Sequence, residues 1–160
     1  MSAWIEEGSL VQTGWRVAKK RHPPYDGTGA SRHGGRWNSP GQPVIYAADS
    51  FAGAILEILA HVQRPRTLPG PHHAVRLDIP ASLIEPLVPG DLPGWDDPDS
   101  PGARRFGDAW LHERRTPVLA VPAVSCRPVG RLFVINPLHP AASRIGVSEP
   151  FDVPWDDRLF

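Results

Sequence analysis

The fold of this chain is decided by residues 34–61, which read GGRWNSPGQPVIYAADSFAGAILEILAH. The stretch opens with a Gly-Gly pair, which lets the backbone approach another group closely. Residues 44–48 form a short apolar run and predict a buried strand. Residues 51–62 repeat apolar side chains with the period of a helix. We therefore expect a turn, a strand and a helix in succession at the centre of the fold.

The helix predicted at 51–62 carries only two ionisable residues, Glu57 and His61. Its other positions are apolar or small, which predicts a helix that is covered nearly all round. A carboxylate is rarely buried without a partner, because its desolvation is costly. Glu57 and His61 are four residues apart and share one side of the helix. Two interpretations stay open: this side lines a polar cleft, or it is a half-exposed face with a Glu–His pair.

The size and charge of the chain limit its class. It has 160 residues, of which 41% are hydrophobic, and this predicts one globular domain. Basic and acidic residues number 17 each, which argues against a generally basic surface for nucleic acid. Basic residues nevertheless gather between positions 14 and 36, where Asp26 is the only acidic residue. This local excess indicates a site for a small anionic ligand, and scattered solvated charge is the alternative.

Several other classes are excluded by what the sequence lacks. The single cysteine, Cys126, excludes an internal disulfide and a zinc site built from several cysteines. No apolar run reaches the length of a membrane span, and the N-terminal residues do not read as a signal peptide. We therefore expect a cytoplasmic protein that holds no metal ion and enters no membrane.

Outside the central stretch, the hydrophobic pattern predicts a helix at 106–112 and strands at 15–18, 74–79, 118–121 and 132–135. The segments 19–36 and 89–102 are rich in glycine, proline and polar residues and are expected to be loops. Residues 141–160 are expected to form a loop-rich tail. Many short strands with few helices predict an α+β fold, in which helices flank a small central mixed β-sheet.

A series of motifs, in this order along the chain, resembles the RES domain family. They are GTGA at 27–30, GGRWN at 34–38, PVIYAA at 43–48, LE at 56–57, GDAW at 107–110 and INP at 135–137. The resemblance implies a fold like that of the ADP-ribosyltransferase toxins. It implies one RES domain over 1–160, with its core at about 14–140. Family members are toxins of bacterial toxin–antitoxin pairs, so an Xre-like antitoxin is the implied partner.

The resemblance also implies an enzyme that consumes NAD. Family members cleave the bond between nicotinamide and ribose and pass ADP-ribose to water, to phosphate or to a protein target. This chain is most similar to the members that modify a protein. NAD is then the substrate, and no cofactor is expected. The resemblance leaves both a single chain and a homodimer open.

The family's substrate-binding residues correspond to the basic, glycine-rich part of this chain. By this resemblance Arg36 takes the position of the family Arg, and Arg16 that of a second basic residue in the same pocket. Gly34 and Gly35 bring the backbone close to NAD, and Tyr46 takes the position of the pocket aromatic. Planar guanidinium groups suit the pyrophosphate, because they bind phosphate oxygens in bidentate fashion. A salt bridge is the structural alternative for each arginine, and a place in the core is the alternative for Tyr46.

The resemblance gives Glu57 as the catalytic carboxylate and His61 as its companion. Family members usually have Val-Pro-Ser, whereas this chain has Ala123 in place of the serine. The nearest hydroxyl belongs to Ser125, two residues further, which would point to the same face of a strand. The candidate catalytic residues are therefore Glu57, Arg36, His61 and Ser125. A structural role is the alternative for Glu57, through an ion pair with an arginine, and for His61 and Ser125.

The chemistry explains why a carboxylate is needed. Cleavage of the nicotinamide–ribose bond passes through a transition state similar to an oxocarbenium ion. Nicotinamide leaves as a neutral molecule, so the reaction needs negative charge near the ribose and no acid catalyst. Two other classes of function stay open. The main one is a non-catalytic nucleotide-binding module, in which Ala123 marks a degenerate active site. Nucleic-acid binding by 19–36 is less favoured, because stacking aromatics are not interleaved with its basic residues.

Overall fold

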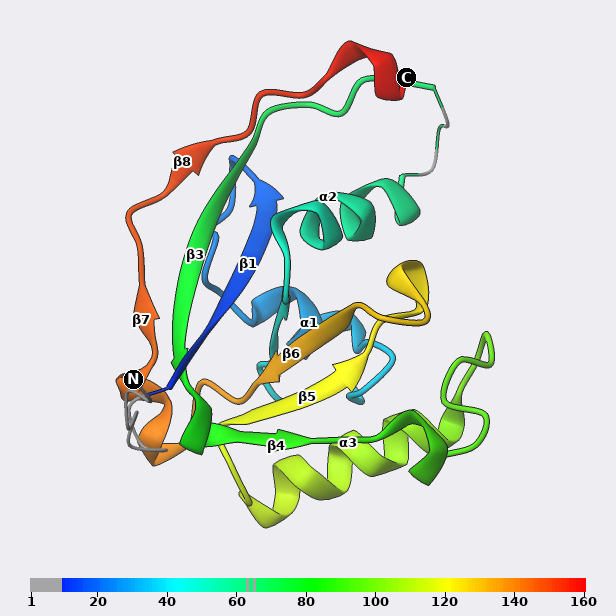
Figure 1. Cartoon of the computed structure of the whole chain (residues 1–160), viewed down its shortest axis with the longest axis vertical. Helices are drawn as coiled ribbons and strands as arrows, with labels where there is room; N and C mark the ends of the chain where they lie inside the picture. Colours follow the sequence, from blue (N-terminus) through cyan, green and yellow to red (C-terminus); the bar gives the residue numbers. More distant parts are fainter. Residues whose placement is uncertain (1–9, 63, 65) are drawn as a thin grey trace, which may run out of the picture.

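A computed structural model describes residues 10–62, 64 and 66–160 (Figure 1). Within this part of the chain, eight strands form one sheet in the order β4-β5-β6-β2-β1-β3-β7, and β8 also pairs with β3. The strands are β1 (Val11–Lys19), β2 (Ile45–Ala48), β3 (His72–Pro80), β4 (Ile84–Pro86), β5 (Val118–Pro122), β6 (Arg131–Ile135), β7 (Gly146–Val147) and β8 (Phe151–Asp152). All paired strands are antiparallel except β4 and β5, which are parallel.

Three α-helices flank this sheet in the described residues: α1 (Thr28–His33), α2 (Phe51–Ala60) and α3 (Pro101–Glu113). Short 3-10 helices are η2 (Ala81–Leu83), η3 (Pro89–Asp91), η4 (Val124–Cys126), η5 (Pro140–Arg144) and η6 (Asp157–Leu159). In Figure 1, α2 lies near the C-terminal end of β1, which it contacts. The predicted α+β fold, with a small mixed sheet and flanking helices, is confirmed.

Two segments that were expected to be loops contain a helix or the start of one. α3 begins at Pro101, within the segment 89–102 that was expected to be a loop, because Ser100 caps it. The Ala103 N–H donates to the Ser100 hydroxyl at 3.2 Å, and proline is favoured in the first turn. The segment 19–36, also expected to be a loop, contains α1. This six-residue helix has no buried residue, so no apolar pattern marked it in the sequence.

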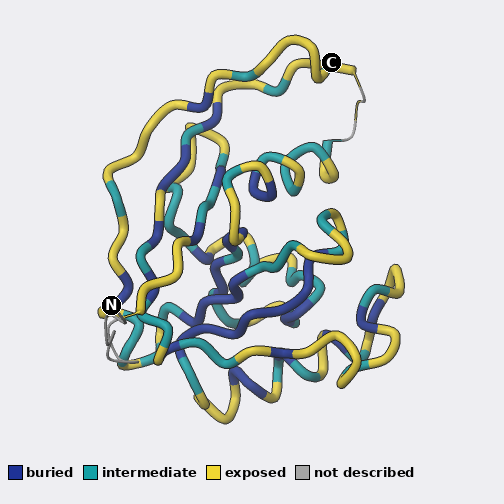
Figure 2. The backbone as a smooth tube through the Cα atoms, in the orientation of Figure 1, coloured by how far each residue is buried: buried dark blue, intermediate teal, exposed yellow. Residues whose placement is uncertain are grey.

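The core lies on both faces of the sheet, as the buried residues in the central strands of Figure 2 indicate. Successive side chains of a strand point to opposite faces. Phe133 of β6 therefore packs with Leu77 in one cluster, while its neighbour Val134 packs with Trp37 and Trp110 in another. Trp37, which follows the Gly-Gly pair, is 1% exposed. The turn at 34–37 is thus anchored to the core by its own tryptophan.

The expectation that the helix at 51–62 is covered nearly all round is wrong. In α2 only Gly53 and Ala54 are buried, and Leu56 is 44% exposed. The helix packs through one side, on a cluster that includes Ala54 and Val17 of β1. The apolar composition of α2 therefore does not predict how much of its surface is buried. The side that carries Glu57 is partly open to solvent.

The segment 141–160, expected to be a loop-rich tail, contributes to the sheet and to the core. Its two-residue strands β7 and β8 both pair with β3. Ile145 and Val153 are buried, in two different apolar clusters. The chain therefore returns along the edge of β3 and covers it, as Figure 1 shows.

Candidate active site

A large cleft opens between α2, the turn at 34–37 and the first turn of α3, with a volume of about 1130 Å³. Ligand sites usually measure about 300–1000 Å³, so the cleft is large enough for a dinucleotide. Every residue predicted to bind substrate or to act in catalysis lines it: Arg16, Gly34, Gly35, Arg36, Tyr46, Glu57, His61 and Ser125. The side of α2 that carries Glu57 and His61 thus faces the cleft, although the helix is half exposed.

Glu57 and Ser125 meet in this cleft although they are 68 positions apart in the sequence. The Ser125 hydroxyl donates a short hydrogen bond to Glu57 Oε1. This contact forms because η4 packs against α2. A hydrogen bond from a neutral hydroxyl to a carboxylate orients the carboxylate and leaves its negative charge in place. The arrangement therefore holds the carboxylate at the cleft wall, and no ion pair to it is formed within the part of the chain that the structure describes.

Ser125 reaches the cleft for a different reason than the one predicted. β5 ends at Pro122, and Ser125 lies in the 3-10 turn η4, not on a strand. Ala123 is 1% exposed and is not among the residues that line the cleft. The turn therefore buries the position where the family has serine and presents Ser125 instead.

His61 stands at the C-terminal end of α2 and lines the cleft as an exposed residue. Its Nδ1 lies 2.7 Å from the backbone carbonyl oxygen of Glu57. In the described residues no hydrogen bond joins the imidazole to the Glu57 carboxylate. His61 is thus attached to the residue that it was predicted to accompany, but through the backbone of the helix.

Arg16 lies in the middle of β1 and is half-buried. Its Nε donates to the Pro24 carbonyl at 2.8 Å, and its Nη1 donates to the Tyr46 carbonyl at 2.9 Å. Burial lowers the pKa of the Arg16 guanidinium, and the nearby Asp26 carboxylate partly opposes this shift. An arginine remains charged under these conditions. Arg16 therefore places a fixed positive charge at the floor of the cleft.

Arg36 is fixed by the segment between η3 and α3. Its Nη1 donates to the Trp95 carbonyl at 3.0 Å and to the Asp97 carbonyl at 2.6 Å. Within the described residues, neither Arg36 nor Arg16 forms an ion pair with an acidic side chain, so the salt-bridge alternative is not observed for them. Both guanidinium groups are oriented by neutral carbonyls, which leaves their charge uncompensated by a direct partner.

Tyr46 ties the Gly-Gly turn to β2. Its hydroxyl donates to Asn38 Oδ1 at 2.5 Å and accepts from the Trp37 N–H at 3.3 Å. Burial raises the pKa of the Tyr46 hydroxyl well above its usual range. Gly34 has φ +70°, and a Cβ on Gly35 would lie 2.8 Å from the Tyr46 hydroxyl oxygen, so both positions favour glycine. The Tyr46 hydroxyl is therefore used for structure, and the residue as a whole lines the cleft.

Sequence reasoning did not identify the residues that hold this turn. Asn38 is fully buried and donates to the carbonyls of Ala30 and Ser39. Asp108 of α3 accepts from the Ser39 N–H at 2.8 Å and from the Ser39 hydroxyl at 2.5 Å. The signals were present in the sequence, as the polar ends of the GGRWN and GDAW motifs, but only the fold shows that they meet.

The described residues show neither a metal-binding cluster nor a membrane-spanning helix. They contain no group of three or more His, Cys, Asp or Glu side chains arranged to hold a metal ion. None of their helices is both long and apolar enough to cross a membrane. Cys126, half-buried, lies beside the candidate site, with its Sγ 3.7 Å from the Ser125 hydroxyl oxygen.

Comparison with known families identifies the chain. The model of the RES domain family matches residues 13–156. The chain belongs to the RES domain family. The RES domain described here is 32% identical over 148 residues to a protein named Toxin Res from Pseudomonas putida, across 91% of this chain and 98% of that protein. It is 36% identical over 154 residues to the Prs ADP-ribosylating toxin of a Sphingobium species, across 91% of this chain and 94% of that protein.

A solved structure has the same fold as this RES domain. It is the crystal structure of the MbcT–MbcA toxin–antitoxin complex of M. tuberculosis, with a TM-score of 0.74 over 90% of this chain and 85% of that chain. The sequence identity is 21%, so this likeness shows the fold alone.

Proposed function

We propose that this RES domain is a toxin that consumes NAD, cleaving the nicotinamide–ribose bond and transferring ADP-ribose to a protein target, to water or to phosphate. The observation that carries the proposal is the Glu57 carboxylate. Ser125 holds it in the same cleft as the guanidinium groups of Arg16 and Arg36, which form no ion pair among the described residues. Negative charge for the ribose and positive charge for the phosphates are the two requirements of this substrate. The name of the Sphingobium relative, an ADP-ribosylating toxin, supports the same reaction class.

The residues divide the work between binding and chemistry. Arg16 and Arg36 bind the pyrophosphate, with the N–H groups that their backbone carbonyl partners leave unused. The glycine pair lets the substrate approach the backbone at the turn. The aromatic ring of Tyr46 forms part of the wall against which the nicotinamide packs. NAD is the substrate in this scheme, and no cofactor takes part.

In the chemical step, the bond between ribose C1′ and the nicotinamide nitrogen breaks, and its electron pair stays on the nitrogen. Nicotinamide leaves neutral, and positive charge develops on the ribose. The Glu57 carboxylate stabilises this charge, which is worth most in a cleft from which water is excluded. The oxygen or nitrogen atom of the acceptor then bonds to C1′, and the proton of the acceptor passes to solvent water. Ser125 orients Glu57, and His61 lies beside it at the end of α2.

A product assay tests this function. The purified protein is incubated with NAD and with water, phosphate or a cell extract as acceptor, and mass spectrometry follows nicotinamide, free ADP-ribose, its phosphate ester and modified protein. We expect release of nicotinamide. Glu57→Gln keeps the shape of the side chain and should lower the rate about 100- to 1000-fold. Glu149→Gln, an exposed change far from the cleft, is the matched control and should keep the rate.

Two outcomes would count against the proposal. No nicotinamide release with any acceptor would reject NAD consumption. Tight NAD binding without turnover, unchanged in Ala123→Ser, would favour a non-catalytic nucleotide-binding module.

We also propose that an antitoxin of the Xre-like type restrains this chain in the cytoplasm. The support is that the solved neighbour is a toxin–antitoxin complex. Expression of the wild-type protein should arrest growth, and expression of Glu57→Gln should not. Co-expression with the product of an adjacent gene should relieve the arrest.

A further inference from the structure

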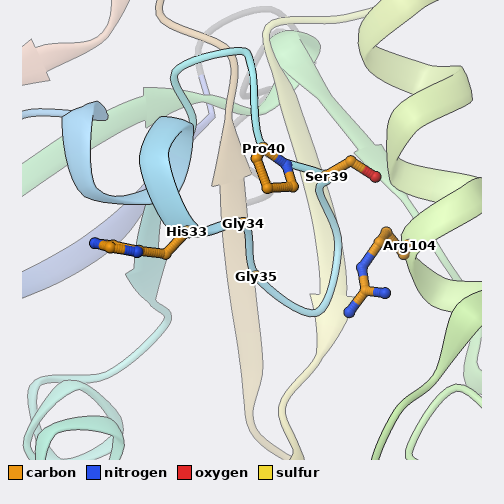
Figure 3. Close-up of a pocket in the computed structure, with 6 residues that line it drawn as sticks. All are labelled: His33, Gly34, Gly35, Ser39, Pro40 and Arg104. Atoms are coloured by element: carbon orange, nitrogen blue, oxygen red, sulfur yellow. The ribbon is translucent and has the colours of Figure 1, made fainter.

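A smaller pocket adjoins the cleft at the Gly-Gly turn (Figure 3). Its volume is about 420 Å³, and it is lined by His33, Gly34, Gly35, Ser39, Pro40 and Arg104. His33, the two glycines and Arg104 also line the large cleft, so the two hollows share an edge. The pocket lies at the lower end of the usual size range for ligand sites, about 300–1000 Å³. It can therefore hold one small polyatomic group next to whatever fills the cleft.

Arg104 is the charged residue of this pocket that can bind a ligand. It is exposed, stands near the start of α3 and, in Figure 3, extends toward the Gly35 end of the turn. Asp108 follows four residues later, which is the spacing of a helical ion pair. Both Asp108 carboxylate oxygens instead accept hydrogen bonds from Ser39. Among the described residues Arg104 has no ion pair and no side-chain hydrogen bond, so all its N–H donors remain free.

The backbone of the turn offers little to a ligand. The Gly34 N–H donates to the Ala30 carbonyl and the Gly35 N–H to the Asn38 carbonyl, both at 2.9 Å. Recognition of a ligand must therefore come from a side chain, the Arg104 guanidinium, because the imidazole of His33 points away from Arg104 in Figure 3. The glycines contribute by leaving space, since they place no side chain between the pocket and the cleft. Asp108, whose carboxylate accepts hydrogen bonds from Ser39 of the pocket lining, is the acidic residue that opposes an anion there.

We propose that this pocket is a second anion site, which binds one phosphate group, and that Arg104 is its main binding residue. A guanidinium group binds phosphate through two parallel, charge-assisted hydrogen bonds to its oxygens. An arginine whose N–H donors are all free can form both bonds. Arg16 and Arg36 each use part of their N–H groups on carbonyls, and Arg32 lines the cleft but not this pocket. Arg104 is therefore the arginine that offers its free donors to the pocket.

The phosphate has two chemical sources, because the pocket opens into the cleft. It is either a phosphate of the bound dinucleotide or a free inorganic phosphate beside it. The choice between these sources rests on the proposed function, in which the dinucleotide fills the cleft. Binding of phosphate by the pocket does not rest on it and is measurable without any NAD.

The test is a calorimetric titration of inorganic phosphate into the purified chain at fixed ionic strength. Wild-type protein should bind phosphate, and Arg104→Gln should weaken the affinity about tenfold, as expected for the loss of a hydrogen bond between charged groups. Arg105→Gln is the matched control. Arg105 is the next residue of α3, equally exposed, and lines neither hollow, so its loss should change the affinity less than about twofold. Unchanged melting temperatures verify that both variants are folded.

The proposal is overturned if wild-type protein binds no phosphate, or if the two variants weaken binding equally, because the effect would then be one of net charge. The affinity for NAD, measured with and without phosphate, identifies the source. If phosphate weakens NAD binding, it occupies the position of a dinucleotide phosphate. If NAD binding is unchanged, phosphate occupies a separate position. Glu57→Gln should bind phosphate like the wild type. If NAD is never consumed but Arg104→Gln alone loses phosphate, the proposed function fails and the anion site stands.

Discussion

The two sides of the cleft are built in opposite ways. The binding wall, which comprises Gly34, Gly35, Trp37, Asn38 and Tyr46, is a buried network in which Asn38 bonds to three neighbours. The carboxylate wall, which comprises Glu57, His61 and Ser125, stands on a half-exposed helix and an exposed turn. Its charged group is held by one side-chain hydrogen bond.

This difference separates stability from chemistry. Removing a member of a buried network leaves polar groups without partners, which costs free energy of unfolding. Exposed side chains away from such networks change stability little. Substitutions in the binding wall should therefore act first on folding, whereas substitutions in the carboxylate wall should act on rate alone.

The largest effect is expected where α3 supports the binding wall. A Cβ on Gly107 would overlap the Trp37 carbonyl oxygen. Because the obstacle is backbone, Gly107→Ala should lower the free energy of unfolding by about 3 kcal/mol and the melting temperature by roughly 10 °C. Gly102→Ala, on the same helix and facing open space, is the control and should lose nothing. Equal melting temperatures for the two variants would show that the backbone at Trp37 shifts to accommodate the added Cβ at little cost in stability.

The next effect concerns the centre of the network. Asn38→Ala leaves the Tyr46 hydroxyl proton and the Ser39 carbonyl without their partner and removes one of the two donors to the Ala30 carbonyl. It should lower the free energy of unfolding by about 2 kcal/mol. The Gly-Gly turn then loses its fixed shape, so the NAD dissociation constant should rise. Asn136→Ala is the matched control, because Asn136 is also buried but does not line or support the cleft. Both variants should lose stability in a melting experiment, and only Asn38→Ala should lose NAD affinity.

Much of the fold could be predicted because apolar runs report buried strands directly. The strands at 118–121 and 132–135 lie in the core, and their pattern was sufficient to locate them. α1 could not be predicted, because a short helix without a buried residue has no periodic pattern. The burial of α2 could not be predicted either, because the residue composition of a helix does not show which other elements pack against it.

The candidate site was predicted as a set of residues, and its internal contacts were not. Motif resemblance located Glu57 and the two arginines, which all line one cleft. The contact between Ser125 and Glu57 depends on the place where β5 ends and η4 begins, and this depends on tertiary packing. The two carbonyls that orient Arg36 belong to a segment 59 and 61 positions away. Such contacts have no local signal in the sequence.

The carboxylate wall is tested by Ser125→Ala. Loss of a hydrogen bond to a charged group should lower the rate of nicotinamide release about tenfold, because Glu57 loses its fixed orientation. The melting temperature should not change, since Ser125 is exposed. Adding Ala123→Ser to this variant restores the family's serine but should not restore the rate, because position 123 is buried and off the cleft. A full rescue would mean that the hydroxyl acts from the buried position.

The smallest effect is a pH dependence that belongs to the binding wall. Burial raises the pKa of the Tyr46 hydroxyl far above its ordinary value of about 10, so the folded protein keeps a proton that the unfolded chain releases. Its contribution to stability is complete below about pH 10 and is lost as the pH rises beyond, by about 1 kcal/mol at pH 11. Tyr46→Phe should make the fall of the unfolding free energy between pH 9 and 11 shallower in denaturant titrations. Part of the slope should remain, because burial also raises the pKa of Tyr25. Identical slopes for wild type and Tyr46→Phe would mean that the hydroxyl is not desolvated, and the binding wall would then be as open as the carboxylate wall.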